Sequence, residues 1–282
     1  MPELPELEVV CEVLQRRVVG QRIVGVKIIP PGGMIVVRDL THQGFESSLI
    51  DKTIAAVMRR GKFLVFSLQP DQPPLYLVIN PKLTGRLRLV EPDKDKQRGK
   101  TFVVFELGNA KQLHYFDQKQ MGQLYLGRDL MAIPGYAEMG PEPLDISLEE
   151  FRERLRPYRG EIKGVLTRGE FVAGIGNAYA DEILWEARLH PYRKRTQLTA
   201  AEVEKLYLGM RTTLLAAVEK VRGAMGENIH EKPRDFMAVH MKAGQPCPRC
   251  GSAISLVGAN QRITNFCRTC QPGGLIKGMG LT

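Results

Sequence analysis

The sequence of 282 residues lacks any apolar run long enough to cross a bilayer, which argues against a helical membrane protein. It also lacks a charged N-terminal stretch followed by an apolar core, so we expect no secretory signal. Internal repeats and low-complexity tracts are absent as well. We therefore expect a cytoplasmic protein whose thiols stay reduced.

Positive charge, in contrast, is abundant. Lysine and arginine number 40 against 31 aspartate and glutamate residues, which gives a formal net charge of +9 and an isoelectric point of about 9.4. Such an excess favours a polyanionic partner, and nucleic acid is the obvious one. The alternative is a solvated basic surface without a partner, and charge alone does not decide between them.

Cysteine is rare, and four of the five cysteines lie close together near the C-terminus. Cys247 and Cys250 form one C-x2-C pair, and Cys267 and Cys270 form a second pair after sixteen intervening residues. This is the spacing of a zinc ribbon, in which two turns each supply two thiolates to one tetrahedral zinc ion. Two disulfides are the alternative, which a reducing compartment disfavours. Cys11 lies on an apolar helix face and is predicted to pack in a core.

The N-terminal part is predicted to be one helix followed by β-structure. Apolar residues recur at helical spacing from residue 4 to residue 19, and Gly20 is a suitable residue after a helix end. Seven short segments bounded by turn residues are then predicted as strands: Ile23–Ile29, Thr53–Met58, Lys62–Leu68, Leu75–Ile79, Leu87–Val90, Thr101–Leu107 and Gln112–Phe116. This succession predicts an antiparallel β-sandwich or barrel over residues 1–132.

Helical patterns replace the strands after a linker rich in proline and glycine at residues 133–145. Four helices are predicted: Leu148–Leu155, Glu161–Thr167, Tyr179–Ala187 and Thr199–Val221. Thr199 and Glu202 have the spacing of a capping box for the last helix. The predicted architecture is α+β with several domains: the β-domain, a helical domain over residues 146–240 and a zinc ribbon over residues 241–282.

The chain begins with Met1, Pro2 and Glu3. If Met1 is removed, Pro2 becomes a secondary amine beside a carboxylate. Such an amine can attack an aldehydic sugar carbon and form an iminium ion, and an unperturbed α-amino pKa of about 7.7–8.0 leaves part of it unprotonated near neutral pH. The alternative is an ordinary helix start, with Pro2 and the glutamates complementing the helix dipole.

A second candidate site is the glycine-rich turn at residues 172–177, which leads into a predicted helix that begins at Asn177 or Ala178. Backbone N–H groups at such a helix start can bind phosphate. The alternative is a simple connection between two helices.

Five motifs occur together in a fixed order: Pro2–Glu6, Arg60–Leu64, Gly140–Leu144, Ala173–Glu182 and the four-cysteine finger that carries Arg262. In this combination the chain resembles, from end to end, the formamidopyrimidine-DNA glycosylase and endonuclease VIII family of base-excision repair enzymes. The resemblance implies a helix on a β-sandwich, a helix–two-turn–helix domain and a zinc finger, with double-stranded DNA in the cleft between the lobes. It also implies a monomer that flips a damaged base, attacks C1′ of the sugar and cleaves the strand by β,δ-elimination.

The resemblance assigns roles to individual residues. Pro2 matches the nucleophile and Glu3 the general acid/base, while Glu6 matches a second acidic position near the site. Lys62 matches a lysine that approaches the DNA backbone at the lesion and assists catalysis.

Two further residues match the groups that grip the phosphates around the flipped nucleotide: Asn177 and Arg262. Arg262 also matches the position linked to δ-elimination. Lys163 lies where the family keeps a lysine and is expected to be a helper at most.

The chain departs from the family pattern in two places. Where the family carries a methionine, an arginine and a phenylalanine that fill the gap left by the flipped base, this chain has Leu83, Lys119 and Met121. Apolar wedges still suit this task, but lysine lacks the planar, bidentate contacts of arginine. Asn80 replaces a phosphate-binding histidine.

The second departure is a short segment between Phe236 and Cys247, where the family has a long loop that caps a flipped 8-oxoguanine. The shortening predicts a more open pocket that favours formamidopyrimidines, oxidised pyrimidines or abasic sites. The alternatives are a non-catalytic protein that binds damaged DNA on the same scaffold and a zinc-ribbon adaptor, which would leave the first 240 residues unexplained.

Overall fold

The structure is a computed structural model that describes residues 1–91, 100–258 and 263–273. The chain divides into two compact units, which are considered separately. The first, called the sheet unit, comprises Met1–Glu138 and Val221–Pro233; the second, called the helical unit, comprises Met139–Lys220 and Arg234–Thr282. Among the described residues, no helix combines the length and the apolar character that crossing a membrane requires.

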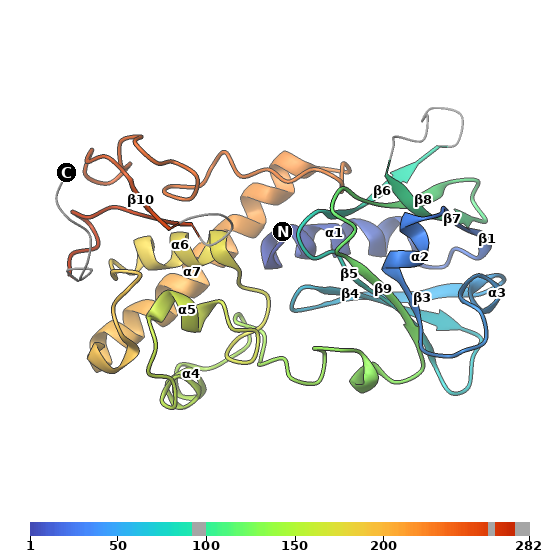
Figure 1. The fold of residues 1–282 in the computed structure, drawn as a ribbon, viewed down its shortest axis with the longest axis horizontal. Coiled ribbons are helices and arrows are strands. Elements are labelled where there is room, and N and C mark those ends of the chain that lie inside the picture. The colour runs from blue at the N-terminus through green and yellow to red at the C-terminus, as the bar shows by residue number, and fades with distance from the viewer. Residues whose placement is uncertain (92–99, 259–262, 274–282) are drawn as a thin grey trace. The chain divides into compact units, whose positions relative to one another are not determined.

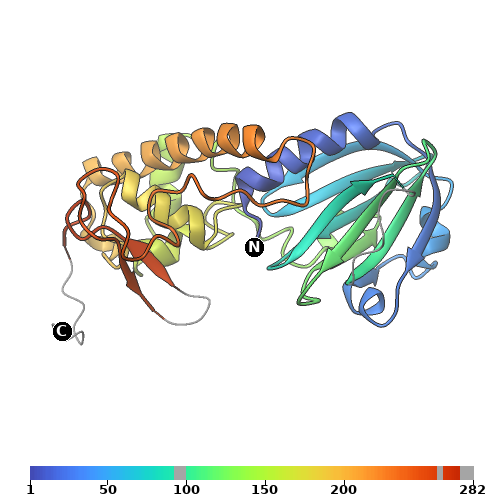
Figure 2. The same cartoon turned by 90° about the horizontal axis from the view of Figure 1, so that it is seen from above.

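The sheet unit contains two β-sheets, seen with their strands in Figure 1 and from a second direction in Figure 2. One sheet has the order β1-β7-β8-β6 and the other the order β2-β9-β5-β4-β3. Every pair is antiparallel except β2 with β9. The strands are β1 (Ile23–Ile28), β2 (Val37–Asp39), β3 (Thr53–Arg60), β4 (Phe63–Gln69), β5 (Leu75–Asn80), β6 (Gly85–Val90), β7 (Thr101–Leu107), β8 (Gln112–Asp117) and β9 (Gln123–Gly127).

The predicted helix and seven strands of this unit are confirmed within one or two residues, while five of its elements were not predicted, among them strands β2 and β9. Two helices of five residues, α2 (Gly32–Val36) and α3 (Phe45–Leu49), interrupt the β-region, and η2 (Leu130–Ala132) follows it. Neither α2 nor α3 has a side-chain N-cap hydrogen bond, so the sequence carried little signal for them. Strand β4 begins at Phe63, so Lys62 lies in the turn before the strand and not within it.

Helix α1 (Leu4–Val18) packs its apolar face against strands β3 and β4. Cys11 lies on this face, and its Sγ is 3.6 Å from the carbonyl oxygen of Val57. Burial raises the pKa of the Cys11 thiol to about 12, and the nearby Glu8 carboxylate adds to that rise. Cys11 is therefore an inert core residue, as its place in the apolar pattern predicted.

The helical unit contains helices from residue 148 to residue 220 and a small hairpin near the C-terminus. Its elements are α4 (Leu148–Leu155), α5 (Ile162–Leu166), α6 (Asn177–Glu186), η3 (Arg195–Gln197), α7 (Ala200–Met225, whose last turn belongs to the sheet unit), β10 (Ser255–Val257) and β11 (Thr264–Phe266). The predicted capping box of α7 is present: Thr199 N donates to Glu202 Oε2 at 2.8 Å, and Glu202 N donates to Thr199 Oγ1 at 3.3 Å. All four predicted helices are confirmed.

Candidate active site and nucleic-acid interface

The N-terminus of α1 places two buried carboxylates next to Pro2. Glu3 is the N-cap residue, and its backbone N–H donates to Glu6 Oε2 at 2.9 Å. The side chains of Glu3 and Glu6 belong to residues that are only 3% and 1% exposed, and Pro2 is buried as well. The positive end of the helix dipole stabilises carboxylates at this position. The first turn of α1 thus holds a proline and two acids in fixed positions.

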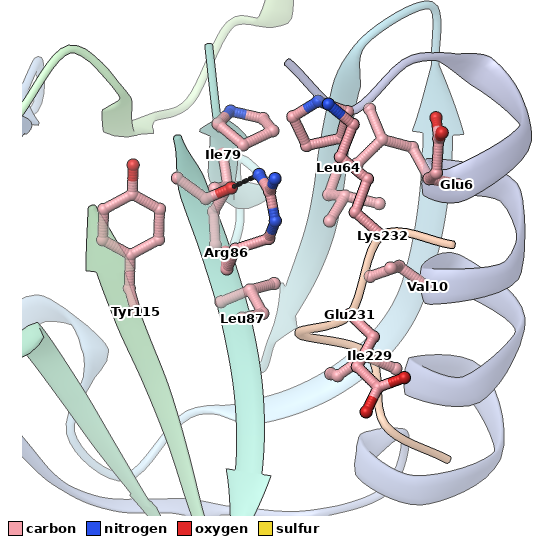
Figure 3. A pocket seen from close by; sticks show the side chains of 14 residues that line it. Glu6, Val10, Leu64, Ile79, Arg86, Leu87, Tyr115, Ile229, Glu231 and Lys232 are labelled. Carbon is pink, nitrogen blue, oxygen red and sulfur yellow. Dashed lines mark hydrogen bonds between the residues drawn. The ribbon is translucent and has the colours of Figure 1, made fainter. Parts of the chain in front are cut away.

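Pro2 and Glu6 line a small cavity in the sheet unit (Figure 3). Its volume of about 20 Å³ is room for a single water molecule. This largely apolar cavity therefore lies against Pro2 and is too small for a nucleobase. Its lining residues are Pro2, Glu6, Leu7, Val10, Leu64, Ile79, Pro81, Gly85, Arg86, Leu87, Tyr115, Ile229, Glu231 and Lys232.

Glu231 and Lys232 reach this cavity from a distant part of the sequence, the segment at residues 221–233 that follows the main body of α7. Arg222 anchors the segment through two hydrogen bonds to Glu12 of α1, at 2.9 and 2.7 Å. Ile229 contributes a side chain that is 2% exposed. Glu231 and Lys232 were not predicted as neighbours of Pro2, because nothing in the local sequence marks such a contact.

Lys62 lies in the tight turn that joins β3 to β4, where Gly61 has a positive φ of 55°. Arg59 holds this turn by donating from Nη1 to the carbonyl oxygen of Gly61 at 3.2 Å. The same guanidinium is paired with Glu8 of α1. The turn that carries Lys62 is thus tied to the helix that begins beside Pro2.

The three residues at the predicted wedge positions lie on two turns of the sheet unit. Leu83 belongs to the turn between β5 and β6 and is half-buried. Lys119 and Met121 belong to the turn between β8 and β9 and are exposed. Asn80 is buried, and its Oδ1 accepts a hydrogen bond from Lys82 N at 3.2 Å, so this side chain supports the first turn from within.

In the helical unit, Asn177 is the first residue of α6, directly after the glycine-rich turn in which Gly174 has a φ of 84°. Its Nδ2 donates to the carbonyl oxygen of Ile263 at 2.8 Å. A side-chain amide has two N–H donors, and this contact uses one of them. Ile263 follows Arg262 in the sequence, and Arg262 itself lies outside the described residues.

A buried polar network surrounds Asp181, which is 1% exposed. Lys163 Nζ lies 2.6 Å from Asp181 Oδ1, and His240 Nδ1 lies 2.8 Å from Asp181 Oδ2. Lys163 also donates to the carbonyl oxygen of Ile263 at 2.9 Å, and Asn265 N donates to Asp181 Oδ2 at 3.2 Å. The network fixes the start of strand β11, next to the Ile263 carbonyl that Asn177 also contacts. Lys163 therefore supports the structure from within, and the roles of Asp181 and His240 were not predicted.

The short segment after Phe236 is held by the neighbouring carboxylate, Glu182. Its oxygens accept hydrogen bonds from three consecutive backbone N–H groups, those of Ala238, Val239 and His240, at 2.7, 2.9 and 2.8 Å. Burial raises the pKa of Glu182, and the three donors oppose that rise. The chain therefore runs directly from Phe236 onto α6 and then towards the cysteines.

The four predicted zinc ligands lie together. The sulfur atoms of Cys247, Cys250, Cys267 and Cys270 are all within 4.8 Å of one another. The distance from Cys247 to Cys270 is 3.8 Å and that from Cys250 to Cys267 is 3.4 Å. Tetrahedral zinc with Zn–S bonds of about 2.3 Å requires S–S distances of about 3.8 Å, so the cluster fits the ion. Trp185 Nε1 donates to Cys247 Sγ at 3.4 Å, a typical outer contact of a metal thiolate.

Three family models match consecutive parts of the chain. They describe the formamidopyrimidine-DNA glycosylase N-terminal domain at residues 1–124, its H2TH domain at residues 139–228 and a zinc finger found in FPG and IleRS at residues 244–273. Together they cover most of the sequence.

Relatives and solved structures agree with these matches. The chain is 40% identical to the formamidopyrimidine-DNA glycosylase of Symbiobacterium thermophilum over 96% of this chain and 90% of that protein. It is similar to Lactococcus lactis Fpg in complex with DNA containing an abasic site, with a TM-score of 0.82 and 30% identity over 96% of this chain and 100% of that one. MutM bound to DNA containing carbocyclic 8-oxo-G has a TM-score of 0.83 at 30% identity, with the same coverage.

Proposed function

Because the chain belongs to the formamidopyrimidine-DNA glycosylase family, we propose that Pro2, freed by removal of Met1, is the nucleophile of a bifunctional DNA glycosylase/AP lyase. The observation that carries this proposal is the burial of Pro2 beside Glu3 and Glu6 at the first turn of α1. Removal of Met1 would turn the nitrogen of this fixed proline ring into a free amine, which favours attack without further reorganisation. Binding to DNA alone would need neither the amine nor the two acids.

In the proposed reaction the Pro2 nitrogen forms a bond to C1′ as the bond from C1′ to the damaged base breaks, and the base leaves with a proton. Glu3 transfers the proton that opens the sugar ring, and the amine lone pair then gives an iminium ion. Loss of a C2′ proton expels the 3′ phosphate in β-elimination, and a second elimination expels the 5′ phosphate. Hydrolysis of the iminium restores the free amine of Pro2.

The proposed DNA contacts come from both units. Lys62 supplies a cation on the turn tied to α1, and Asn177 supplies an amide donor at the start of α6. Arg262 completes the grip on the phosphates around the flipped nucleotide and assists δ-elimination. Phosphate contacts of this kind position the duplex and carry no sequence preference. We propose that the protein acts as a monomer on double-stranded DNA in the cytoplasm, with one structural zinc ion in the finger.

The proposed substrates are formamidopyrimidines, oxidised pyrimidines and abasic sites, in preference to 8-oxoguanine. Two features support this choice: Lys119 at the wedge position where the family has arginine, and the short segment after Phe236. Lysine makes weaker and less specific contacts with the opposite base than arginine does. The short segment leaves less chain to cover a flipped purine.

Borohydride trapping with duplex DNA containing an abasic site tests the proposal. The wild-type protein should become covalently linked to the DNA, and Pro2→Gly should lose most of the adduct while retaining its circular dichroism spectrum. Duplex binding without any trapped adduct would overturn the enzymatic proposal and support the non-catalytic alternative.

A further inference from the structure

We propose that the two turns which carry the wedge residues act as one preorganised part, and that the hydroxyl of Thr84 joins them through the buried carboxylate of Asp117. The two turns, residues 80–85 and 117–122, are called the wedge turns here. Thr84 and Asp117 are positioning residues in this proposal, since they act through Leu83, Lys119 and Met121. The proposal rests on the function proposed above and specifies how the enzyme opens a base pair.

Asp117 is the last residue of β8 and is 0% exposed. Its Oδ2 accepts hydrogen bonds from Gly122 N at 2.7 Å and from the Tyr115 hydroxyl at 3.2 Å. Its Oδ1 accepts from Lys119 N at 3.1 Å and from the hydroxyl of Thr84. A carboxylate has about four lone-pair directions, and here each has a donor. Such complete pairing is what a buried charge requires.

Thr84 is the member of this set that comes from the other turn. Its Oγ1 donates to Asp117 and accepts a hydrogen bond from Lys119 N at 3.0 Å. The turn with Leu83 is thereby bonded to the backbone of the turn with Lys119 and Met121. Among these side-chain contacts, those of Thr84 connect the two turns, and the backbone pairing of Gly85 with Asp117 joins their ends. The remaining bonds to the Asp117 carboxylate lie within its own strand and turn.

Two glycines let the wedge turns close around the same phenol group. A Cβ atom added to Gly85 would lie 2.4 Å from the Tyr115 hydroxyl oxygen, and one added to Gly122 would lie 1.8 Å from it. Any side chain at either position would therefore displace Tyr115. Burial raises the pKa of Tyr115, and Asp117 adds to that rise, so the phenol stays neutral and remains a donor to Asp117.

The tips of both turns have backbone conformations that need support. Lys82 has a φ of 46° and Gln120 a φ of 53°, which is the left-handed region that residues other than glycine seldom adopt. Each of these residues adjoins a wedge residue. Met121 is 48% exposed. Its side chain thus faces solvent on a turn whose backbone is hydrogen-bonded to buried Asp117.

A preorganised pair of turns matters only when the flipped base leaves a gap opposite a partner base. The wedge residues then enter the duplex together, without first ordering their own turns. Without the Thr84 link, the wedge turns would have to become ordered during base flipping, which would lower the rate of base excision from duplex DNA. An abasic site in a single strand has no opposite base and no such gap, so its processing should depend far less on the link.

The test compares Thr84→Val, which removes the hydroxyl at nearly constant volume, with Thr84→Ser, which keeps it. We expect Thr84→Val to lower the single-turnover excision of a formamidopyrimidine from duplex DNA about tenfold, the usual size of a lost hydrogen bond to a charged group. Borohydride trapping on a single-stranded abasic oligonucleotide should stay within about twofold, and Thr84→Ser should restore most of the duplex activity.

Three results distinguish a failure of the Thr84 proposal from a failure of the proposed function. Wild-type excision by Thr84→Val on the duplex would overturn the proposal, and so would an equal loss on both substrates, since that would indicate general damage to the fold. An absence of adduct with the wild-type protein on either substrate would instead overturn the proposed function. In a Met121→Ala background Thr84→Val should cost less than it does alone, because the residue through which it acts is already gone.

Discussion

Asp117 of the sheet unit and Asp181 of the helical unit are both buried, but they are held in different ways. In the sheet unit the Asp117 carboxylate accepts hydrogen bonds from two backbone N–H groups and from two hydroxyls. In the helical unit Asp181 is paired with the cation Lys163 and the imidazole of His240. The finger beside this network has a small core, formed by Val239, Cys247, Ile254 and Cys267.

The two sites therefore depend on different interactions for their local order. The first turn of α1 and the wedge turns of the sheet unit are held by hydrogen bonds within that unit, so we expect them to keep their structure when zinc is removed. The helical unit depends on a buried ion pair and on four thiols that need a metal ion. Its proposed phosphate contacts should therefore be the first part of the site to fail.

Removal of zinc should produce the largest effect. Structural zinc contributes roughly 10–16 kcal/mol to small zinc-finger peptides, so chelation should unfold the finger and lower the affinity for duplex DNA by at least about 100-fold. Calorimetry should show an early transition for the helical unit while the transition of the sheet unit is retained. If one cooperative transition persisted unchanged after complete chelation, the contrast between the units would be wrong.

Asp181→Ala should have the next largest effect. It leaves the buried Lys163 ammonium without its partner, which costs about 3–5 kcal/mol in comparable cases. The matched control is Asp145→Ala, an exposed aspartate of the same unit, which should change the free energy of unfolding by no more than about 0.5 kcal/mol. Equal unfolding midpoints for the two variants in urea would show that the network is dispensable.

The smallest effect concerns the pH dependence of the sheet unit. Hydrogen bonds from Arg222 hold the pKa of Glu12 below its ordinary value. A depressed folded-state pKa adds stability above the unfolded value of about 4.3, and this contribution is lost as the pH falls through the folded-state pKa. Because the Glu12 side chain is 26% exposed, we expect about 0.5–1 kcal/mol at pH 7.

Urea unfolding of the wild-type protein and of Glu12→Gln measures this contribution. The difference between them should shrink as the pH falls from 5 to 3. A difference that stayed constant across this range would mean that the ion pair does not anchor the segment at residues 221–233.

Local patterns made much of this structure predictable. The spacing of the cysteines predicted their cluster, and the pairing of Thr199 with Glu202 predicted the start of α7, because each C-x2-C pair and the capping box lie within a few residues of sequence. The joining of Thr84 to Asp117 had no such signal, since two turns 33 residues apart meet only in the folded sheet. Lys232 could not be predicted for the same reason, because it lines a cavity together with Pro2 although the two residues are far apart in the sequence.

The most direct test of the central claim is to locate the covalent bond. The wild-type protein would be trapped on abasic DNA with borohydride, digested with a protease and a nuclease, and the adduct peptide sequenced by mass spectrometry. We expect Met1 to be absent and the sugar remnant to be attached to the nitrogen of Pro2. Attachment to Lys62, Lys232 or any other lysine would contradict it.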